Sequence, residues 1–535
     1  MTQENTFKEY ILNGYTFKGD SIVLGTAILK GEAIPQTHIK IPLKSLNRHG
    51  LIAGATGTGK TKTLQIIAEA LSGKSVPVML MDIKGDLSGI AQAGKNHPKI
   101  DERMSKIGLP YAPREFPVEL LSLSDEKGVR LRATVSEFGP ILFSKILELN
   151  DTQESYMSVI FKYCDDKGLP LLDLKDIKKV LNYFTNEGKT EVQESYGRIS
   201  TSSLGTILRK IIELEQQGAD LFFGEKSFEV DDLMRIDEKG NGVISILRLT
   251  DLQDRPKLFS TFMLSLLAEI YSSFPEEGDL EQPKLVIFID EAHLIFEEAS
   301  KALLDQIETI IKLIRSKGVG IYFCTQNPTD IPDEVLSQLG LKVQHALRAF
   351  TAKDRKMIKL TAENYPLSDY YKTDKMLTLL GIGEAAITAL NEKGIPTPLA
   401  ATLLCAPKSR MDILSKPEID QLISTSKLIK KYNKTIDRES AYEMLNDKLT
   451  VAAKRDAAQT KGIPKQTRRT NPRKTRTGKK TTRTKKPKGA FEKALSSPLS
   501  KQIGRTLTRE LTRGILGVLG LGGTTRRKKK KGFLF

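Results

Sequence analysis

Short runs of apolar residues alternate along this chain with stretches in which apolar residues recur every three or four positions. The runs near 51–53, 76–81, 243–249, 285–289 and 319–324 predict strands buried on both faces of a sheet. The helical spacing between them, for example at Leu64, Ile67 and Leu71, predicts helices. Strands that alternate with helices indicate an α/β protein with a doubly wound parallel sheet flanked by helices.

The segment between the second and third strands has a mainly helical pattern, with amphipathic helices predicted near 139–148, 152–164, 175–184 and 201–216. It therefore reads as a helical insertion beside the sheet. For residues 1–460 the pattern predicts four parts. They are a short N-terminal segment (1–48), a core that contains the sheet (49–100 and 240–410), the insertion (101–239) and a helical C-terminal extension (411–460).

The net charge of +18 comes from the end of the chain. Residues 461–535 hold 24 basic and two acidic residues, which leaves 59 basic and 63 acidic residues before them. The almost purely polar range 461–489 predicts a disordered basic linker. In 490–535, Leu499, Ile503 and Leu507 alternate with Arg505 and Arg509, which predicts a basic amphipathic helix followed by a tail. Such a helix can dock on nucleic-acid phosphates, an anionic membrane surface or a partner groove, or pack on the body.

The cysteines and the apolar runs limit the class of protein. Cys164, Cys324 and Cys405 lie far apart, which excludes a disulfide scaffold or a cysteine zinc cluster and fits a reducing compartment. The polar start has no signal-peptide pattern, and no run approaches the roughly 18 apolar residues of a membrane span. We therefore expect a soluble, cytoplasmic body.

The strongest chemical signal is a glycine-rich phosphate-binding motif between a predicted strand and a predicted helix. It satisfies G-x-x-x-x-G-K-[ST] with the residues Gly54, Ala55, Thr56, Gly57, Thr58, Gly59, Lys60 and Thr61. Its backbone N–H groups and the helix N-terminus favour phosphate oxygens, and Lys60 is expected to reach the β- and γ-phosphates. The Thr61 hydroxyl is a candidate Mg²⁺ ligand, and Thr63 is a further candidate for nucleotide binding. The motif predicts a P-loop NTPase that uses ATP and Mg²⁺.

Carboxylates follow two of the predicted strands, at the edge where open α/β sheets bind ligands. Asp290 and Glu291 end the apolar run 285–289; we expect Asp290 to support Mg²⁺ and Glu291 to polarise the attacking water. Asp82 ends the run 76–81 and is either a further metal support or the cap of a turn.

Three further side chains are candidates because they lie close in the sequence to the strands that form this predicted edge. Gln326, after the strand 319–324, either senses the γ-phosphate or forms the turn before Asn327-Pro328. Arg315 ends a predicted helix, where a basic residue is stabilising in any case. His293 follows the acidic pair, and a packing role is at least as well supported as a chemical one.

The pattern as a whole resembles the HerA/FtsK superfamily of P-loop motor ATPases, and within it the HerA-like bacterial proteins of the YjgR type. The resemblance covers about residues 10–410 and extends to Gly504-Arg505 and Arg513–Gly517; it includes Arg132-Ala133-Thr134, Leu149–Gln153, Leu214–Ala219 and Asp290–Leu294. It implies a RecA/FtsK-like fold and a ring, usually a hexamer, with nucleotide between subunits. It also implies that Arg315 acts as an arginine finger and that the motor translocates or unwinds DNA.

Two other functions remain open at this stage. One is a membrane-associated ATPase of the same superfamily that translocates or remodels protein, with residues 490–535 on anionic lipid. The other is a nucleotide-gated scaffold without motor activity, although Glu291 argues against it because a switch has little need of a water-activating carboxylate.

Overall fold

The computed structural model describes residues 3–460, apart from 252–254, 279, 299–300, 435 and 437. The predictions of a disordered linker at 461–489 and of a basic amphipathic helix at 490–535 lie outside the described residues. Among the described helices, none combines the length and the apolar character needed to cross a membrane.

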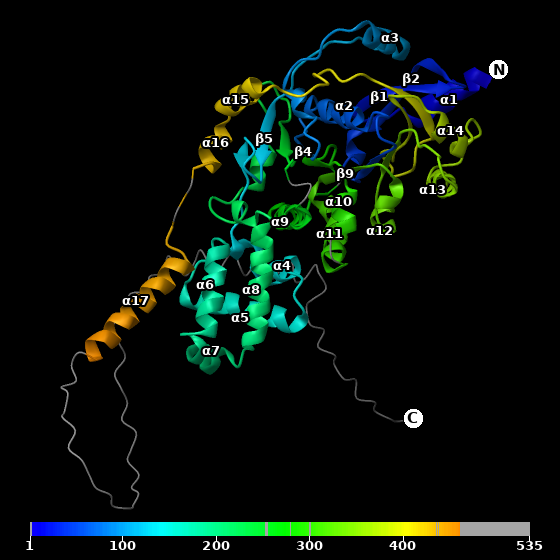
Figure 1. Cartoon of the computed structure of the whole chain (residues 1–535). Helices are drawn as coiled ribbons and strands as arrows, with labels where there is room; N and C mark the ends of the chain where they lie inside the picture. Colours follow the sequence, from blue (N-terminus) through cyan, green and yellow to red (C-terminus); the bar gives the residue numbers. More distant parts are fainter. Residues whose placement is uncertain are drawn as a thin grey trace, which may run out of the picture.

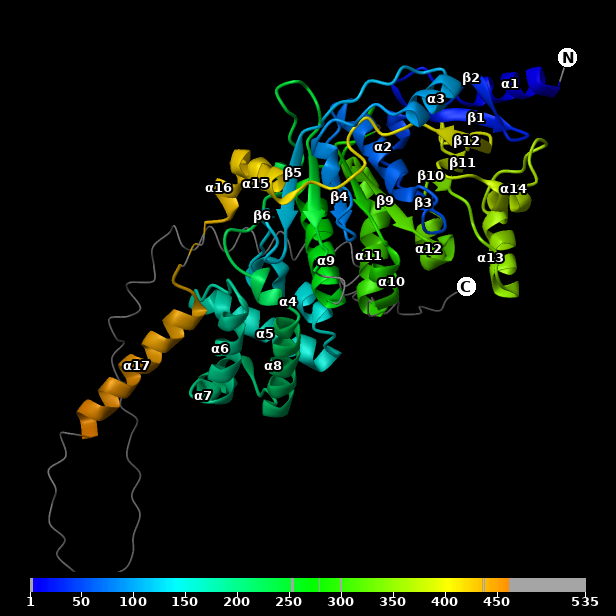
Figure 2. The same cartoon turned by 45° about the horizontal axis from the view of Figure 1, so that its top comes forward.

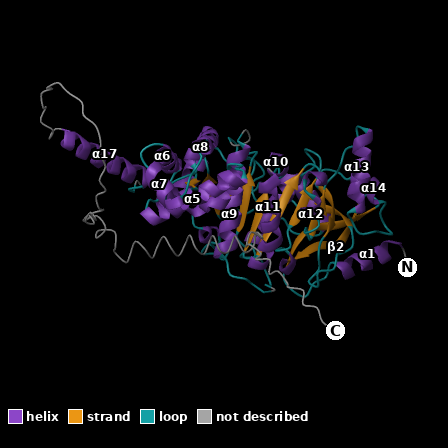
Figure 3. Cartoon of the chain, turned by 90° about the horizontal axis from the view of Figure 1, so that it is seen from below, coloured by secondary structure: helices purple, strands orange, loops and turns teal. Residues whose placement is uncertain are grey.

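Within the described part of the chain, twelve strands form one sheet in the order β2-β1-β12-β11-β10-β3-β9-β8-β4-β7-β5-β6. Figure 3 shows the strands in orange, with helices around them. The strands are β1 (Ser21–Leu29), β2 (Glu32–Pro42), β3 (Gly50–Ala53), β4 (Val78–Asp82), β5 (Val118–Ser122), β6 (Val129–Arg130), β7 (Ile244–Arg248), β8 (Leu285–Ile289), β9 (Val319–Thr325), β10 (Leu341–Gln344), β11 (Glu384–Thr388) and β12 (Ala400–Leu404). From β10 to β6 all neighbours are parallel, whereas β2, β1, β12, β11 and β10 pair antiparallel.

Helices cover both faces of the parallel part of the sheet (Figures 1 and 2). The helices are α1 (Gln3–Gly14), α2 (Lys60–Ser72), α3 (Pro98–Ile107), α4 (Val135–Ile146), α5 (Asp151–Lys167), α6 (Leu174–Thr185), α7 (Lys189–Tyr196), α8 (Thr201–Gln216), α9 (Pro256–Ser273), α10 (His293–Glu298), α11 (Lys301–Ile314), α12 (Asp333–Leu336), α13 (Ala352–Glu363), α14 (Thr373–Leu379), α15 (Lys416–Thr425), α16 (Lys427–Tyr432) and α17 (Ala441–Thr460). Along β4, Met79 and Met81 belong to the core that includes α9 and α11, and Val78 and Leu80 belong to the core that includes α2. Because successive side chains of a strand point to opposite faces, the apolar runs serve two cores.

The fold class expected from the sequence is confirmed: the chain has a P-loop NTPase sheet flanked by helices, and all five expected strands are present as β3, β4, β7, β8 and β9. The structure adds strands that the apolar runs did not reveal. Residues 1–48 contribute α1 and the β1–β2 hairpin at one end of the sheet, and β5 and β6 belong to the sheet although they lie within 101–239. β5, with the sequence Val118-Glu119-Leu120-Leu121-Ser122, is too polar to read as a buried run, and it gains its place by pairing with β7.

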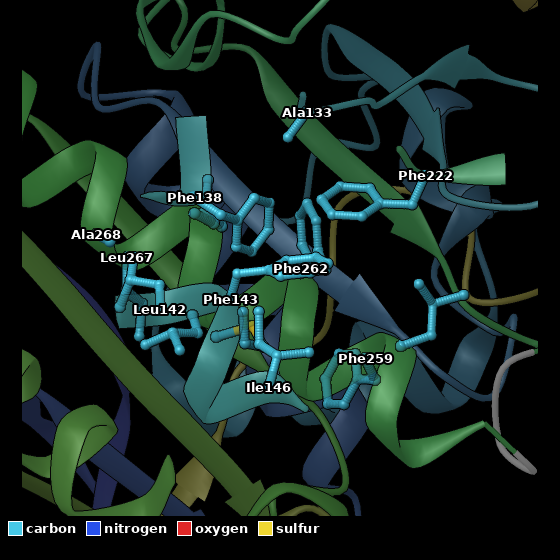
Figure 4. Close-up of a cluster of buried hydrophobic side chains, with 14 of the residues drawn as sticks. Ala133, Phe138, Leu142, Phe143, Ile146, Phe222, Phe259, Phe262, Leu267 and Ala268 are labelled. Atoms are coloured by element: carbon cyan, nitrogen blue, oxygen red, sulfur yellow. The ribbon is translucent and has the colours of Figure 1, made fainter. Parts of the chain in front are cut away.

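Helices α4 to α8 form the helical insertion, and local capping explains where they begin. Thr134, Asn150 and Asp173 each accept a backbone N–H at the start of α4, α5 and α6 and form capping boxes there. Aromatic side chains join the insertion to α9: the rings of Phe138 and Phe222 lie 6.1 Å apart, and those of Phe222 and Phe262 lie 6.0 Å apart, both edge to face (Figure 4). The insertion therefore shares one apolar core with the sheet face that α9 covers.

The C-terminal extension runs back across the molecule to the insertion, where α17 begins beside α6 and projects beyond it (Figure 1). The segment that leads into it is fixed to α2, since the backbone N–H groups of Lys408 and Ser409 donate to the Glu69 carboxylate at 2.7 and 3.1 Å. Its last helix, α17, packs against α6, and the Ala441 N–H donates to Pro170 O at 2.9 Å. The extension thus links the helix after the glycine-rich loop to the helical insertion.

Candidate functional site

The glycine-rich loop connects β3 to α2 and adopts the curled backbone that the motif requires. Gly54, Gly57 and Gly59 have φ values of 150°, 78° and 114°, a region that disfavours residues with a Cβ. At Gly54 an added Cβ would lie 2.5 Å from the Cβ of His345, so the close approach also requires glycine. α2 begins at Lys60, and its first N–H groups therefore face the ligand side of the loop.

Lys60 lies inside this curl, and only 6% of it is exposed. Its ammonium donates to the carbonyl oxygens of Gly54 at 2.6 Å and Ala55 at 3.3 Å. Burial lowers the pKa of Lys60, as does the neighbouring Lys84, and Glu291 and Asp290 oppose that shift. The charges of the loop lysine and the acidic pair therefore act on one another, as expected for groups around one pocket.

The acidic pair follows β8 and is deeply buried: Asp290 is 3% and Glu291 6% exposed. Burial raises the pKa of Asp290 to about 7, against the opposing charge of Lys84. One oxygen of this carboxylate, Oδ2, is buried with no hydrogen-bond partner. Glu291 has a φ of 46°, an uncommon conformation for a residue other than glycine that recurs at functional sites.

The sheet order explains why the loop and the acidic pair lie together. β3, β9 and β8 are parallel neighbours, so their carboxyl ends meet at one edge of the sheet. Lys60 and Thr61 follow β3, Gln326 follows β9, and Asp290 and Glu291 follow β8. Gln326 is exposed and directly follows β9, which lies between β3 and β8, and it precedes a turn in which Asp330 accepts the Asn327 N–H at 3.0 Å.

This edge fits a magnesium ion bound together with a nucleotide. The described residues hold no cluster of three or more His, Cys, Asp or Glu side chains that would bind a metal by itself. Asp290 offers a buried carboxylate oxygen without a hydrogen-bond partner. Thr61, the second residue of α2, offers a hydroxyl directly after the loop. Mg²⁺ is commonly held by one or two protein oxygens together with phosphates and waters, so this sparse donor set is suitable.

Two predicted site residues have another role in the structure. The Asp82 carboxylate accepts the backbone N–H groups of Gly85, Asp86 and Leu87 at 2.8, 3.1 and 3.1 Å, so it caps the turn after β4, the alternative left open by the sequence. Burial raises its pKa to about 6. The Thr63 hydroxyl lies 2.9 Å from His345 Nε2 and is buried, which places it behind the loop rather than among the N–H groups that line it.

Arg315 lies away from this edge. It begins the short 3₁₀ turn η5 (Arg315–Lys317), which precedes β9, and it helps to lower the pKa of His49, which burial brings to about 4. His49 immediately precedes β3, so both residues belong to the amino end of the parallel strands. Arg315 therefore lies away from Lys60 of its own chain. Its role as an arginine finger toward the nucleotide of a neighbouring subunit stays a prediction.

Sequence reasoning missed Lys84 and His345. The Lys84 ammonium forms an ion pair with Glu291 Oε1; burial opposes its charge, but Glu291 and Asp290 keep the pKa of Lys84 raised. Burial lowers the pKa of His345 to about 4, and Lys60 adds to this, so a neutral ring supports the loop from behind. Lys84 lies two residues after Asp82, a residue that the sequence does mark as a candidate. Only the pairing of β4 with β8, however, brings Lys84 to Glu291.

Comparison with known proteins agrees with this geometry. The family described as "Helicase HerA-like C-terminal" matches residues 27–527. The "DNA double-strand break repair helicase HerA" of Sulfurisphaera tokodaii is 24% identical over 357 residues, which cover 65% of this chain and 64% of that protein. The "DNA import protein CedB" of Sulfolobus acidocaldarius is 23% identical over 390 residues, covering 72% of this chain and 56% of that protein.

Two solved structures align with most of this chain. The "bacterial conjugative coupling protein" TrwB aligns with a TM-score of 0.49 at 14% identity, covering 76% of this chain and 94% of that chain. VirB4 of Thermoanaerobacter pseudethanolicus aligns with a TM-score of 0.46 at 15% identity, covering 76% and 99%. The chain spans less than two thirds of the length of the first HerA relatives, 64% and 63%. Since the family match covers most of its length, the chain belongs to the HerA-like C-terminal helicase family.

Proposed function

We propose that this protein is a Mg²⁺-dependent ATPase that drives a DNA translocase or helicase in the cytoplasm. The observation that carries the proposal is the meeting of Lys60, Asp290 and Glu291 at one edge of the sheet, with the loop curled for phosphate. Phosphoryl transfer requires mainly positioning and neutralisation of charge, and these groups supply both.

Each residue has a defined task in this proposal. The N–H groups of 54–61 and the N-terminus of α2 bind the phosphates, and Lys60 neutralises the charge that develops on the γ-phosphate. Thr61 and Asp290 would hold Mg²⁺, which neutralises the phosphate charge when bound. Glu291 accepts hydrogen bonds from the attacking water, and Gln326, which directly follows β9, orients that water.

The proposed cargo is supported by the names of relatives, and the proposed assembly by the position of Arg315. Relatives are named as a DNA repair helicase and a DNA import protein, which supports DNA as the cargo. Since Arg315 lies at the amino end of its own strands, it can serve only the nucleotide of a neighbouring subunit; we propose a ring, most simply a hexamer, in which it acts as an arginine finger. Residues 461–535, with 24 basic residues, would add electrostatic contacts to DNA phosphates.

The test measures ATP binding and ATP hydrolysis separately, with and without DNA. Glu291→Gln keeps the shape of the side chain, so it should still bind ATP but hydrolyse it roughly 100-fold or more slowly. Lys60→Ala should lose ATP binding, and DNA should raise the turnover of the parent protein. Normal turnover in Glu291→Gln would contradict the mechanism.

The cargo is tested on the same preparations. Removal of 490–535 should flatten the salt dependence of DNA binding, because fewer phosphates are neutralised. If turnover ignores every DNA form and the protein instead floats with anionic liposomes through 490–535, the protein-translocating function replaces this one. ATP binding without any turnover would favour a nucleotide-gated scaffold.

A further inference from the structure

One oxygen of the Glu291 carboxylate is already engaged in an ion pair within its own chain, and Oε2 has no hydrogen-bond partner. Oε1 forms the ion pair with the Lys84 ammonium, and Oε2 lies 3.3 Å from His293 Nδ1. The two partners of the ion pair differ in exposure, since the Glu291 side chain is 7% exposed and that of Lys84 39%. The carboxylate is therefore fixed in a buried position, whereas the lysine reaches it from a more open one.

The direction of this ion pair follows from the sheet order. β4, which carries Lys84 beyond its end, lies on one side of β8, and β9 and β3 lie on the other. The ammonium therefore meets the Glu291 carboxylate from the β4 side of β8, whereas the glycine-rich loop follows β3 on the other side. A water placed to attack a phosphate in that loop needs the carboxylate on the loop side.

The backbone at Glu291 does not swing freely, so any change of direction falls to the side chain. Glu291 O accepts the Leu294 N–H at 3.0 Å, and the next residue, Ala292, donates its N–H to Cys324 O in β9 at 2.9 Å. The φ of 46° at Glu291 is held between these two bonds. Redirecting the carboxylate thus means breaking the contact with Lys84 and rotating the side chain.

We propose that Lys84 is a positioning residue that holds the Glu291 carboxylate on the β4 side of the site and thereby restrains ATP hydrolysis until the ion pair opens. The inference rests on the proposed ATPase function and adds a restraint to it. Lys84 also acts electrostatically on Lys60, so its charge lies near that of the loop lysine.

The test compares Lys84→Met, which keeps the length of the side chain but removes its charge, with Lys84→Arg, which keeps the charge. For the whole chain, Lys84→Met should raise kcat about tenfold, the change expected when a modest restraint on the transition state is lost. KM should stay close to that of the parent, since the loop and Lys60 are untouched. Lys84→Arg should return kcat toward the parent value, and Lys84→Met combined with Glu291→Gln should show no gain.

Lys178→Met is the matched control, because it removes a lysine–glutamate ion pair of 2.6 Å from the helical insertion, far from the loop. It should leave kcat and KM unchanged, although both methionine variants lose one ion pair. A purely structural ion pair at Lys84 would give a lower melting temperature and no rise in kcat.

The outcomes separate this inference from the proposed function. If the parent hydrolyses ATP and Lys84→Met is equally fast or slower, the restraint is wrong and the ATPase function stands. If parent and Lys84→Met both bind ATP and neither hydrolyses it, a released Glu291 does not activate water, and both proposals are wrong. Turnover in Lys84→Met with little in the parent would be the clearest support.

Discussion

Two buried aspartates in different regions of this molecule show how similar burial can serve opposite purposes. Asp176, in the helical insertion, is 0% exposed, and its carboxylate accepts from Leu172 N at 2.8 Å, Asp173 N at 3.0 Å, Ser440 Oγ at 2.5 Å and Tyr442 N at 2.9 Å. Asp290, at the end of β8, is 3% exposed and keeps one oxygen without a partner.

The two carboxylates differ in whether their oxygens have hydrogen-bond donors. A buried carboxylate with donors on both oxygens stabilises the elements that supply them, and here it joins the extension at Ser440 and Tyr442 to the start of α6. A buried carboxylate with an unsatisfied oxygen costs stability, which is reflected in the raised pKa of Asp290 near 7. Such a cost is expected where a cation completes the site.

The largest effect is expected from removing the charge of Asp290. Asp290→Asn should lower ATP turnover on the order of 100-fold and weaken the dependence on Mg²⁺, because a neutral amide is a poor partner for the cation. The melting temperature without nucleotide should stay the same or rise, because an uncompensated buried charge is removed. ATPase rates over a range of Mg²⁺ concentrations and thermal melts measure both effects. Unaltered turnover would contradict the assignment of Asp290 as a carboxylate that holds the cation.

A smaller effect, on stability alone, is expected at Asp176. Asp176→Ala leaves the surrounding donors unsatisfied and should cost about 3 kcal/mol in the unfolding of the insertion. Urea unfolding followed by the tyrosine signal measures this loss, and ATP affinity measured beside it should not change. If nucleotide affinity fell as much as stability, Asp176 would not be a purely structural carboxylate.

The smallest effect is expected at Glu269 on α9, an acid that lies outside the nucleotide edge and whose negative charge is destabilised by burial. Burial, reinforced by Glu137, raises its pKa to about 8, so the folded protein holds this proton more tightly than the unfolded chain does. The parent should therefore lose stability as pH rises from about 4 toward 8, and Glu269→Gln should be more stable by about 2 kcal/mol at pH 8 but not at pH 4. Melting curves across this range test it, and a difference independent of pH would contradict the assignment.

The nucleotide edge was largely predictable because its signals are local in the sequence. The loop from Gly54 to Thr61 needs only its own glycines and the adjoining strand and helix, and an apolar run ending in Asp290 and Glu291 points to the carboxyl edge of a sheet. The five strands that carry or neighbour this edge were predicted for the same reason, since strands buried on both faces are almost purely apolar.

The remaining features depend on pairing between distant parts of the chain. β1 pairs antiparallel with β2 and with β12, and β12 comes from the far end of the sheet-forming sequence, so no single segment reveals this pairing. Asp82 at a strand end resembles a ligand in the sequence, but the turn that follows takes both of its oxygens. The contact of Lys84 with Glu291 similarly requires that β4 lie beside β8.

The most direct test of the central claim is a crystal structure of the Glu291→Gln variant with ATP and Mg²⁺. The account predicts the triphosphate within hydrogen-bond distance of the N–H groups of 57–61, with Mg²⁺ between the Thr61 hydroxyl and Asp290 and the γ-phosphate facing position 291. A nucleotide bound at another edge of the sheet, or one bound in the loop with Asp290 and position 291 turned away from its phosphates, would contradict it.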